Sequence, residues 1–127
     1  MDLIYDMLKM ITICLKKYTE FKGRASRSEY WYWALFIILS DIILYIIEEV
    51  VFGYSPTLII SLLFLIIFIT PTVSVSVRRL HDINKSGKWL LLALFPIIGW
   101  IILFIWSIKK GDEGDNEFGS DPLKSGT

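Results

Sequence analysis

Three long apolar stretches dominate the sequence, at residues 31–52, 58–77 and 89–108. A helix needs about 20 mostly apolar residues to cross about 30 Å of hydrocarbon, and each stretch is long enough. Aromatic rings favour the headgroup boundary, and they begin two of the stretches, at residues 30–33 and at Trp89. The pattern therefore predicts an all-α polytopic membrane protein with three transmembrane helices, at residues 27–52, 56–77 and 89–108.

Two of these helices have recognisable N-terminal signals. Ser26 and Glu29 have the spacing of a capping box, in which each side chain accepts a hydrogen bond from the other residue's backbone. Ser55 precedes Pro56, which places a capping hydroxyl before a proline at the first helical position. Both signals directly precede an apolar run, so the expected helix starts agree with the hydropathy.

The two ends of the chain differ from its apolar middle. In residues 1–20, apolar side chains recur at helical spacing and charges fall on the opposite side, which predicts an amphipathic helix. We expect this helix to lie in the cytoplasmic interface rather than to cross the membrane; a dimerisation helix is the alternative. Residues 109–127 are rich in Gly, Asp and Glu and predict a polar, solvated tail.

The distribution of Lys and Arg predicts the orientation. Before the first stretch stand Lys9, Lys16, Lys17, Lys22, Arg24 and Arg27. The loop after it has no basic residue, whereas the next loop, residues 78–88, has Arg78, Arg79, Lys85 and Lys88. Basic loops stay on the cytoplasmic side, so the N-terminus and residues 78–88 are predicted to be cytoplasmic, and three spans would place the C-terminus outside.

The third stretch has a second interpretation. Pro96 and Gly99 interrupt it near its middle, and Lys109 and Lys110 follow it. These features are also typical of a re-entrant hairpin that returns to the cytoplasm, with its backbone shielded by protein. Three full spans remain the expectation.

Composition narrows the classes of function. The 127 residues suffice for a single unit, and 54% of them are hydrophobic. Positive and negative charges balance at 13 each, so net charge indicates no partner, and nucleic acid is not expected. The single cysteine, Cys14, and the single histidine, His81, exclude a disulfide framework and argue against a metal site. No nucleophile elbow, P-loop or dinucleotide-binding turn is present, so we expect no cofactor and no enzyme.

A polar cluster is predicted at the cytoplasmic end of the first two transmembrane helices. If these helices are antiparallel neighbours, their ends bring together Arg24, Arg27, Arg78, Arg79, His81 and Asp82, with Glu29 beside them. Guanidinium groups suit phosphate and carboxylate, which favours a site for an anionic lipid headgroup or an acidic partner. Alternatively, the arginines only anchor the topology and complement helix C-termini, and His81 is an interfacial histidine with one hydrogen bond.

A second candidate lies within the first transmembrane helix. Asp41, Tyr45 and Glu48 form one polar stripe at helical spacing, and an intramembrane carboxylate suggests a proton or cation pathway. The alternative is a hydrogen bond from Asp41 to Ser61 or to a hydroxyl of the series Thr70, Thr72, Ser74 and Ser76. Pro71 predicts a kink in the second transmembrane helix.

Four sequence motifs follow one another along the chain in an order that is found in a known protein family. They are Phe21-x-Gly23-Arg24-Ala25-x-Arg27-x-Glu29-Tyr30-Trp31, Arg78-Arg79-Leu80-His81-Asp82-x-x-x-Ser86-Gly87-x-Trp89, Pro96-x-x-Gly99, and Gly111-x-x-Gly114-x-Asn116-x-Phe118-Gly119-x-Asp121-Pro122. Together they resemble the bacterial "domain of unknown function" family eight-oh-five, small inner-membrane proteins, over about residues 15–122. Lys88 stands where many relatives have a tryptophan.

The resemblance implies a bacterial cytoplasmic-membrane location and a helical architecture, and it implies no activity. It also suggests that Asn116, Phe118, Asp121 and Pro122 dock on the helices. We therefore predict a non-enzymatic interaction or scaffold protein that binds membrane lipids. Its protein partner is either a second copy of itself, in a homo-oligomer, or another membrane protein. The alternatives are a small transporter or channel that uses the acidic stripe, and a lipid-active enzyme that uses His81 and Asp82.

Overall fold

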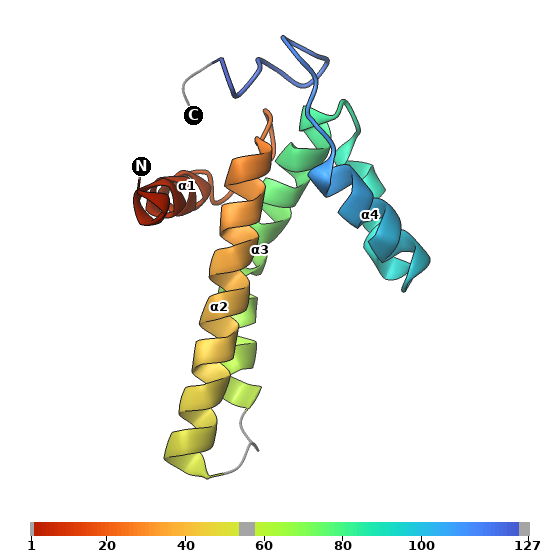
Figure 1. Ribbon diagram of the computed structural model, residues 1–127. Coiled ribbons are helices and arrows are strands. Elements are labelled where there is room, and N and C mark those ends of the chain that lie inside the picture. Colours follow the sequence, from red (N-terminus) through yellow and green to blue (C-terminus); the bar gives the residue numbers. More distant parts are fainter. Residues whose placement is uncertain (1, 54–57, 125–127) are drawn as a thin grey trace.

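The computed structural model describes residues 2–53 and 58–124, and within them every regular element is helical. The elements are α1 (Leu3–Lys16), α2 (Arg27–Phe52), α3 (Leu58–Asp82), the 3-10 helix η1 (Gly87–Leu94) and α4 (Ile98–Ile108). Figure 1 shows α2 and α3 as a long pair, with α1 and the η1–α4 unit at one end of it. The all-α fold class is confirmed.

The α2–α3 pair is held by aromatic packing and by hydrogen bonds between the two helices. The ring of Trp33 on α2 lies 5.3 Å from that of Phe36 and 6.0 Å from that of Phe68 on α3. The indole of Trp33 donates to the hydroxyl of Thr72 at 3.0 Å. α2 ends at Gly53, whose φ of 75° suits a glycine that terminates a helix. The helix therefore occupies the same residues, 27–52, as the first predicted span.

One helix of the described ranges is long and apolar enough to cross a membrane on length and composition, namely α3 over Ile59–Asp82. The prediction of three transmembrane helices is thus not confirmed. Pro71 does lie inside α3, where Thr72 donates to the carbonyl of Phe68 and Ser76 donates to that of Thr72. The predicted cap at Ser55 and Pro56 lies outside the described residues.

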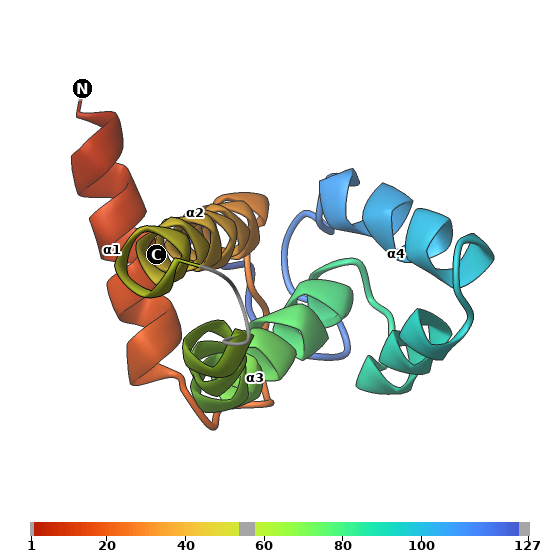
Figure 2. The ribbon, with the colours of Figure 1, turned by 90° about the horizontal axis from the view of Figure 1, so that it is seen from below.

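The third apolar stretch is not one helix, and that prediction was wrong. η1 and α4 are separated by a turn at Pro96 and Ile97, and Ile97 has a φ of 71°. The turn is close-packed, because a Cβ on Gly99 would lie 1.8 Å from the carbonyl oxygen of Leu92. The indole of Trp100 donates to the carbonyl of Ala93 at 2.8 Å. The stretch folds back as a helical hairpin (Figure 2), the shape of the alternative interpretation.

Helix α1 lies across the α2–α3 pair: it is seen end-on in Figure 1 and along its length in Figure 2. It begins at Asp2, whose carboxylate accepts from the backbone of Ile4 at 3.1 Å. Ile11 and Cys14 of α1 are buried in the hydrophobic cluster that also includes Trp33. The crossing places α1 level with the start of α2.

The C-terminal segment, residues 109–124, covers the same end of the pair (Figure 1). Asn116 and Gly119 form an isolated β-bridge, and Asp121 and Pro122 are buried. The expectation of a merely solvated tail was wrong, because carbonyls and side chains of this segment bind the loop before α2 and the end of α3, as described below. The docking implied by the family resemblance is present.

Candidate functional site: the arginine cluster

The structure gathers most of the predicted basic site in one place. We use "arginine cluster" for Arg24, Arg78, Arg79 and their carboxylate partners Glu29 and Asp82. All five residues are buried, with exposures from 0% to 4%. His81 lies beside them at 8%, whereas Arg27 is exposed at the edge. Arg24 comes from the loop before α2, Glu29 from the first turn of α2, and the others from the last turns of α3.

Asp82 is the centre of the cluster. Its Oδ1 accepts from Arg24 Nε at 3.0 Å, and its Oδ2 accepts from Arg79 Nη1 at 2.7 Å. The other donors of Arg24 reach backbone carbonyls of the C-terminal segment, those of Asp112, Gly114 and Gly119. One carboxylate and several carbonyl dipoles therefore compensate two buried cations, as burial of charge requires.

Arg79 and Arg27 bind the end of the helical hairpin. Arg79 donates to the carbonyls of Ser107 and Lys109, the former at 3.2 Å. Arg27 donates to the carbonyl of Ile108 at 3.3 Å, and the indole of Trp31 donates to that of Ser107 at 3.1 Å. The last carbonyls of a helix lack partners within it and carry partial negative charge, so cations stabilise that end.

Arg78 and Glu29 form the other half of the cluster. Arg78 Nη1 lies 2.5 Å from Glu29 Oε2, and Arg78 Nε donates to the carbonyl of Glu20 at 3.2 Å. The thiol of Cys14 lies 3.5 Å from the same carboxylate oxygen, and burial raises the pKa of this thiol far above its ordinary value. The predicted capping box is therefore half formed: Ser26 accepts from the backbone of Glu29, but the Glu29 side chain pairs with Arg78.

His81 links the cluster to the C-terminal segment. Its Nδ1 lies 2.8 Å from the carbonyl oxygen of Gly23, so this nitrogen must carry the proton in that hydrogen bond. Its ring stacks on Phe118, and its carbonyl accepts from the amide of Asn116 at 2.9 Å. Asp121 orders the same segment by accepting from the backbones of Gly114 and Leu123, both at 3.0 Å, and these bonds lower the pKa of its carboxyl.

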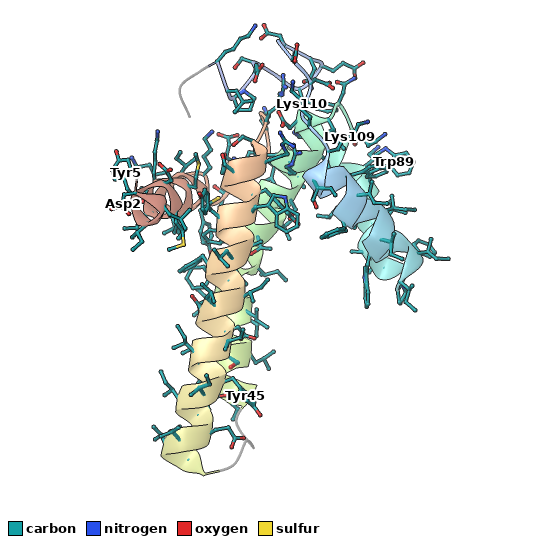
Figure 3. The ribbon with its side chains drawn as sticks, in the orientation of Figure 1. Asp2, Tyr5, Tyr45, Trp89, Lys109 and Lys110 are labelled. Atoms are coloured by element: carbon teal, nitrogen blue, oxygen red, sulfur yellow. The ribbon has the colours of Figure 1, made fainter. Side chains whose placement is uncertain are left out.

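Two hollows meet at the exposed Arg27. A pocket of about 220 Å³ lies between the first turn of α2 and the C-terminal segment and is lined by Arg27, Ser28 and Lys110 among others. An apolar groove of about 580 Å³ starts at the same Arg27 and Ser28 and runs along α2 to Ile38. Lys110 is exposed beside Lys109 at the end of α4 (Figure 3) and pairs with Glu113 at 2.7 Å.

Asp41, Tyr45 and Glu48, the predicted acidic stripe, all lie on α2, and no hydrogen bond joins them in the described part of the chain. Glu48 is fully buried and accepts from the backbone of Ile60 at 2.8 Å and from the hydroxyl of Ser61 at 3.4 Å. Tyr45 is 46% exposed on the surface of the pair (Figure 3). Asp41 has one buried oxygen without a hydrogen-bond partner. Glu48, rather than Asp41, bonds Ser61.

Sequence reasoning missed the carbonyl ligands of the arginines, because backbone groups leave no residue-type signal. Sequence reasoning also did not predict the contact between Cys14 and Glu29. Among the described residues, no group of three or more His, Cys, Asp and Glu side chains is arranged to hold a metal ion.

Comparison with known proteins gives a consistent picture. A family model described as "Protein of unknown function (DUF805)" matches residues 18–120. Inner membrane protein YhaI of Escherichia coli K12 is 38% identical over 108 residues, which are 85% of this chain and 90% of the relative. Inner membrane protein YhaH of the same strain is 37% identical over 111 residues, with coverages of 85% and 91%. No solved structure matches.

Proposed function

The chain belongs to the DUF805 family, and from this membership and its helical architecture we propose that it is a non-enzymatic scaffold protein of the bacterial inner membrane. The α2–α3 pair crosses the bilayer, since the 26 residues of α2 reach about 39 Å at about 1.5 Å per residue. The apolar side chains along both helices, such as Ile43, Ile46 and Ile66, are half exposed and face lipid.

The orientation follows from the basic residues. Arg24, Arg78 and Arg79 gather at one end of the pair, and the positive-inside rule makes this end cytoplasmic. α1 lies in the interface at this level, and the η1–α4 hairpin enters and leaves from the same side. Both termini are then cytoplasmic, in contrast to the outside C-terminus expected from three spans.

The observation that carries the scaffold role is the buried network around Asp82. Through it the loop before α2, the end of α3, the end of α4 and the C-terminal segment all bind one another. Such a network fixes a surface rather than a catalytic cleft, because the guanidinium groups of Arg24 and Arg79 donate to groups within the chain. Its outer rim, where Arg27 and Lys110 are exposed, is the part that can meet an anionic headgroup or an acidic partner.

We assign the headgroup to the pocket at Arg27. Among the described residues, Arg27 donates one hydrogen bond, from Nη1 to the carbonyl of Ile108, and Ser28 and Lys110 line the same pocket. A phosphate there would leave its acyl chain in the groove that runs from Arg27 toward Ile38. Asp82 also lines this pocket, with its carboxylate paired to Arg24 and Arg79. Arg24, Arg78, Arg79 and His81 hold the walls of the site in place rather than touch the lipid.

Native mass spectrometry of protein in mild detergent tests this assignment. The wild type should retain an anionic phospholipid. Arg27→Gln should lose most of it with at most a small change in thermal stability, because Arg79 still binds the end of α4. Lys9→Gln is the matched control, because Lys9 is an exposed cation on α1 that does not line the pocket. Equal retention by Arg27→Gln and Lys9→Gln would remove the pocket from the proposal.

A second candidate function is a proton or cation pathway through Asp41. The observation that favours it is the buried carboxylate oxygen that has no hydrogen-bond partner, because an intramembrane carboxylate is costly unless it has a role. Flux into liposomes that disappears in Asp41→Asn would support it. Flux that is absent in the wild type, or that persists in the variant, would dismiss it.

A further inference from the structure

The molecule has different widths at its two ends. Figure 1 shows α1, η1 and α4 beside the end of the α2–α3 pair that carries the arginine cluster. Among the described residues, the other end is formed by α2 and α3. We propose that this wedge makes the protein collect where the cytoplasmic face of the membrane is convex. The proposal rests on the membrane placement given above and goes beyond it, because a scaffold need not distinguish flat from curved membrane.

The hairpin reaches only about half-way into the bilayer. The eight residues of η1 rise about 16 Å at about 2.0 Å per residue, and the 11 residues of α4 rise about 16 Å at about 1.5 Å per residue. The hydrocarbon core is about 30 Å thick. The hairpin therefore occupies the cytoplasmic leaflet and not the opposite one.

The exposed tip of the hairpin indicates that it is immersed in acyl chains. Leu94, Phe95, Ile97 and Ile98 are 64% to 76% exposed, and no charged residue occurs between Trp89 and Ile108. An apolar patch of this kind costs free energy in water. Some carbonyls of the turn accept hydrogen bonds within the hairpin. The backbone N–H of Phe95 donates to the carbonyl of Leu92 at 3.0 Å, and that of Gly99 donates to the carbonyl of Phe95 at 2.9 Å.

Helix α1 has three faces, and one of them is suited to lipid. Met10, Ile11 and Cys14 are buried against the helix pair. Ile4, Leu8 and Leu15 lie on an adjacent side and are 62%, 54% and 43% exposed. Lys9 and Lys16 are exposed on the remaining side. An amphipathic helix of this kind inserts its apolar side at the boundary between headgroups and acyl chains and responds to curvature.

The difference in area between the two leaflets is substantial. The 14 residues of α1 cover on the order of 200 Å² when the helix lies flat, at about 1.5 Å per residue and about 10 Å across. Each arm of the hairpin adds on the order of 80 Å² in cross-section. The cytoplasmic leaflet therefore accommodates on the order of 350 Å² more protein than the opposite leaflet.

Hydrogen bonds to the α2–α3 pair prevent α1 and the hairpin from changing position independently. Arg79 and Arg27 hold the end of α4 against α2 and α3. The hydroxyl of Tyr18, just after α1, donates to the carbonyl of Ile67 on α3 at 2.9 Å. Because these hydrogen bonds join the residue after α1 and the end of α4 to the helix pair, the extra area is a fixed property of the fold, and the lipid must accommodate it.

Sorting on tubules pulled from giant vesicles tests the inference. Labelled protein is inserted from outside into uncharged vesicles, so that the cytoplasmic end faces out, and its density per lipid is compared between tubule and flat membrane. We expect enrichment of about twofold or more on the tubule. The triple variant Ile4→Gln, Leu8→Gln, Leu15→Gln makes the lipid-facing side of α1 polar and leaves its buried side unchanged. It should reduce the enrichment to half of the wild-type value or less.

The matched control is Lys9→Gln with Lys16→Gln, which changes the same helix on its solvent side and should sort like the wild type. Equal wild-type density on tubule and flat membrane would overturn the inference. It would also be overturned if the triple variant were enriched on the tubule as strongly as the wild type. Protease cleavage of the C-terminal segment from outside, and resistance to alkaline extraction, report insertion separately. Failure of those two measurements would count against the proposed membrane placement instead.

Discussion

The ring of Phe118 lies flat against the imidazole of His81, with ring centroids 4.2 Å apart and planes 3° apart. The two residues are distant in sequence, and their stacking fastens the C-terminal segment over the last turn of α3. Together with the amide of Asn116 on the carbonyl of His81, it closes the exposed side of the arginine cluster.

Replacing Phe118 with alanine should loosen the C-terminal segment while leaving the helices intact. A stacked aromatic pair contributes about 0.5–1.5 kcal/mol beyond the area that it buries. We expect faster protease cleavage within residues 109–124 and a modest loss of thermal stability in detergent. Leu123→Ala is the control, because Leu123 is 69% exposed. Identical cleavage rates in both variants would show that the stacking does not retain the segment.

Replacing Asp82 with asparagine should be among the most damaging single changes. It leaves Arg24 and Arg79 buried without their shared carboxylate, and breaking a buried pair costs about 3–5 kcal/mol. The variant should express poorly or unfold at markedly lower temperature. Glu113→Gln, which breaks the exposed pair with Lys110, should change little. A fully stable Asp82→Asn would contradict the assigned role.

Docking of the C-terminal segment should weaken in acid. Hydrogen bonds from the backbones of Leu123 and Gly114 hold the pKa of Asp121 below its ordinary value. The released segment therefore binds the proton more readily than the docked one, so the contribution of Asp121 is complete above an ordinary aspartate pKa of about 3.9 and is lost as pH falls through the lower docked pKa. Protease sensitivity of the segment should rise over that window, and Asp121→Asn should remove the dependence. A pH-independent wild type would refute the assignment.

Gly99→Ala should disrupt the hairpin. The added Cβ would lie 1.8 Å from the carbonyl oxygen of Leu92, a backbone atom that cannot step aside. We expect a clear loss of thermal stability. Gly53→Asn is the control, since its Cβ would meet nothing within 4 Å and asparagine tolerates a positive φ. A stable Gly99→Ala would mean that the turn between η1 and α4 is looser than described.

Reporter fusions should place both termini in the cytoplasm. A phosphatase that is active only in the periplasm should be inactive when fused after residue 127 and active when fused after Gly53. A fluorescent reporter that matures only in the cytoplasm should give the opposite pattern. Phosphatase activity at the C-terminal fusion would restore a third complete span.

The sequence predicts the beginning and end of α2 well, because Ser26 marks the first and the end of the apolar run at Phe52 marks the second. It offers the hairpin only as an alternative to a third span, because hydropathy records how apolar residues 89–108 are and not whether the chain reverses. Ile97 adopts a positive φ that its residue type disfavours, so the reversal depends on surrounding structure. Gly99 and Pro96 were the available signals for it.

For the candidate site, residue types predict which charges meet but not how they are compensated. Arg78, Arg79 and Asp82 are near one another in sequence, and their proximity to Arg24 follows from an antiparallel helix pair. That Arg24 binds carbonyls of Asp112 and Gly114 depends on the path of the C-terminal segment. The same arginines could therefore be read from sequence as free anion ligands, although only Arg27 remains exposed.

The shared position of the two chain ends has a consequence for biogenesis. In the proposed topology the translocated part of the chain is only the short segment between α2 and α3, and no Lys or Arg occurs between Tyr30 and Val77. Insertion then requires no export of a folded domain and no passage of a basic residue across the bilayer. The α2–α3 unit can enter as one helical hairpin, before the ribosome has delivered the carbonyls that Arg24 and Arg79 will bind.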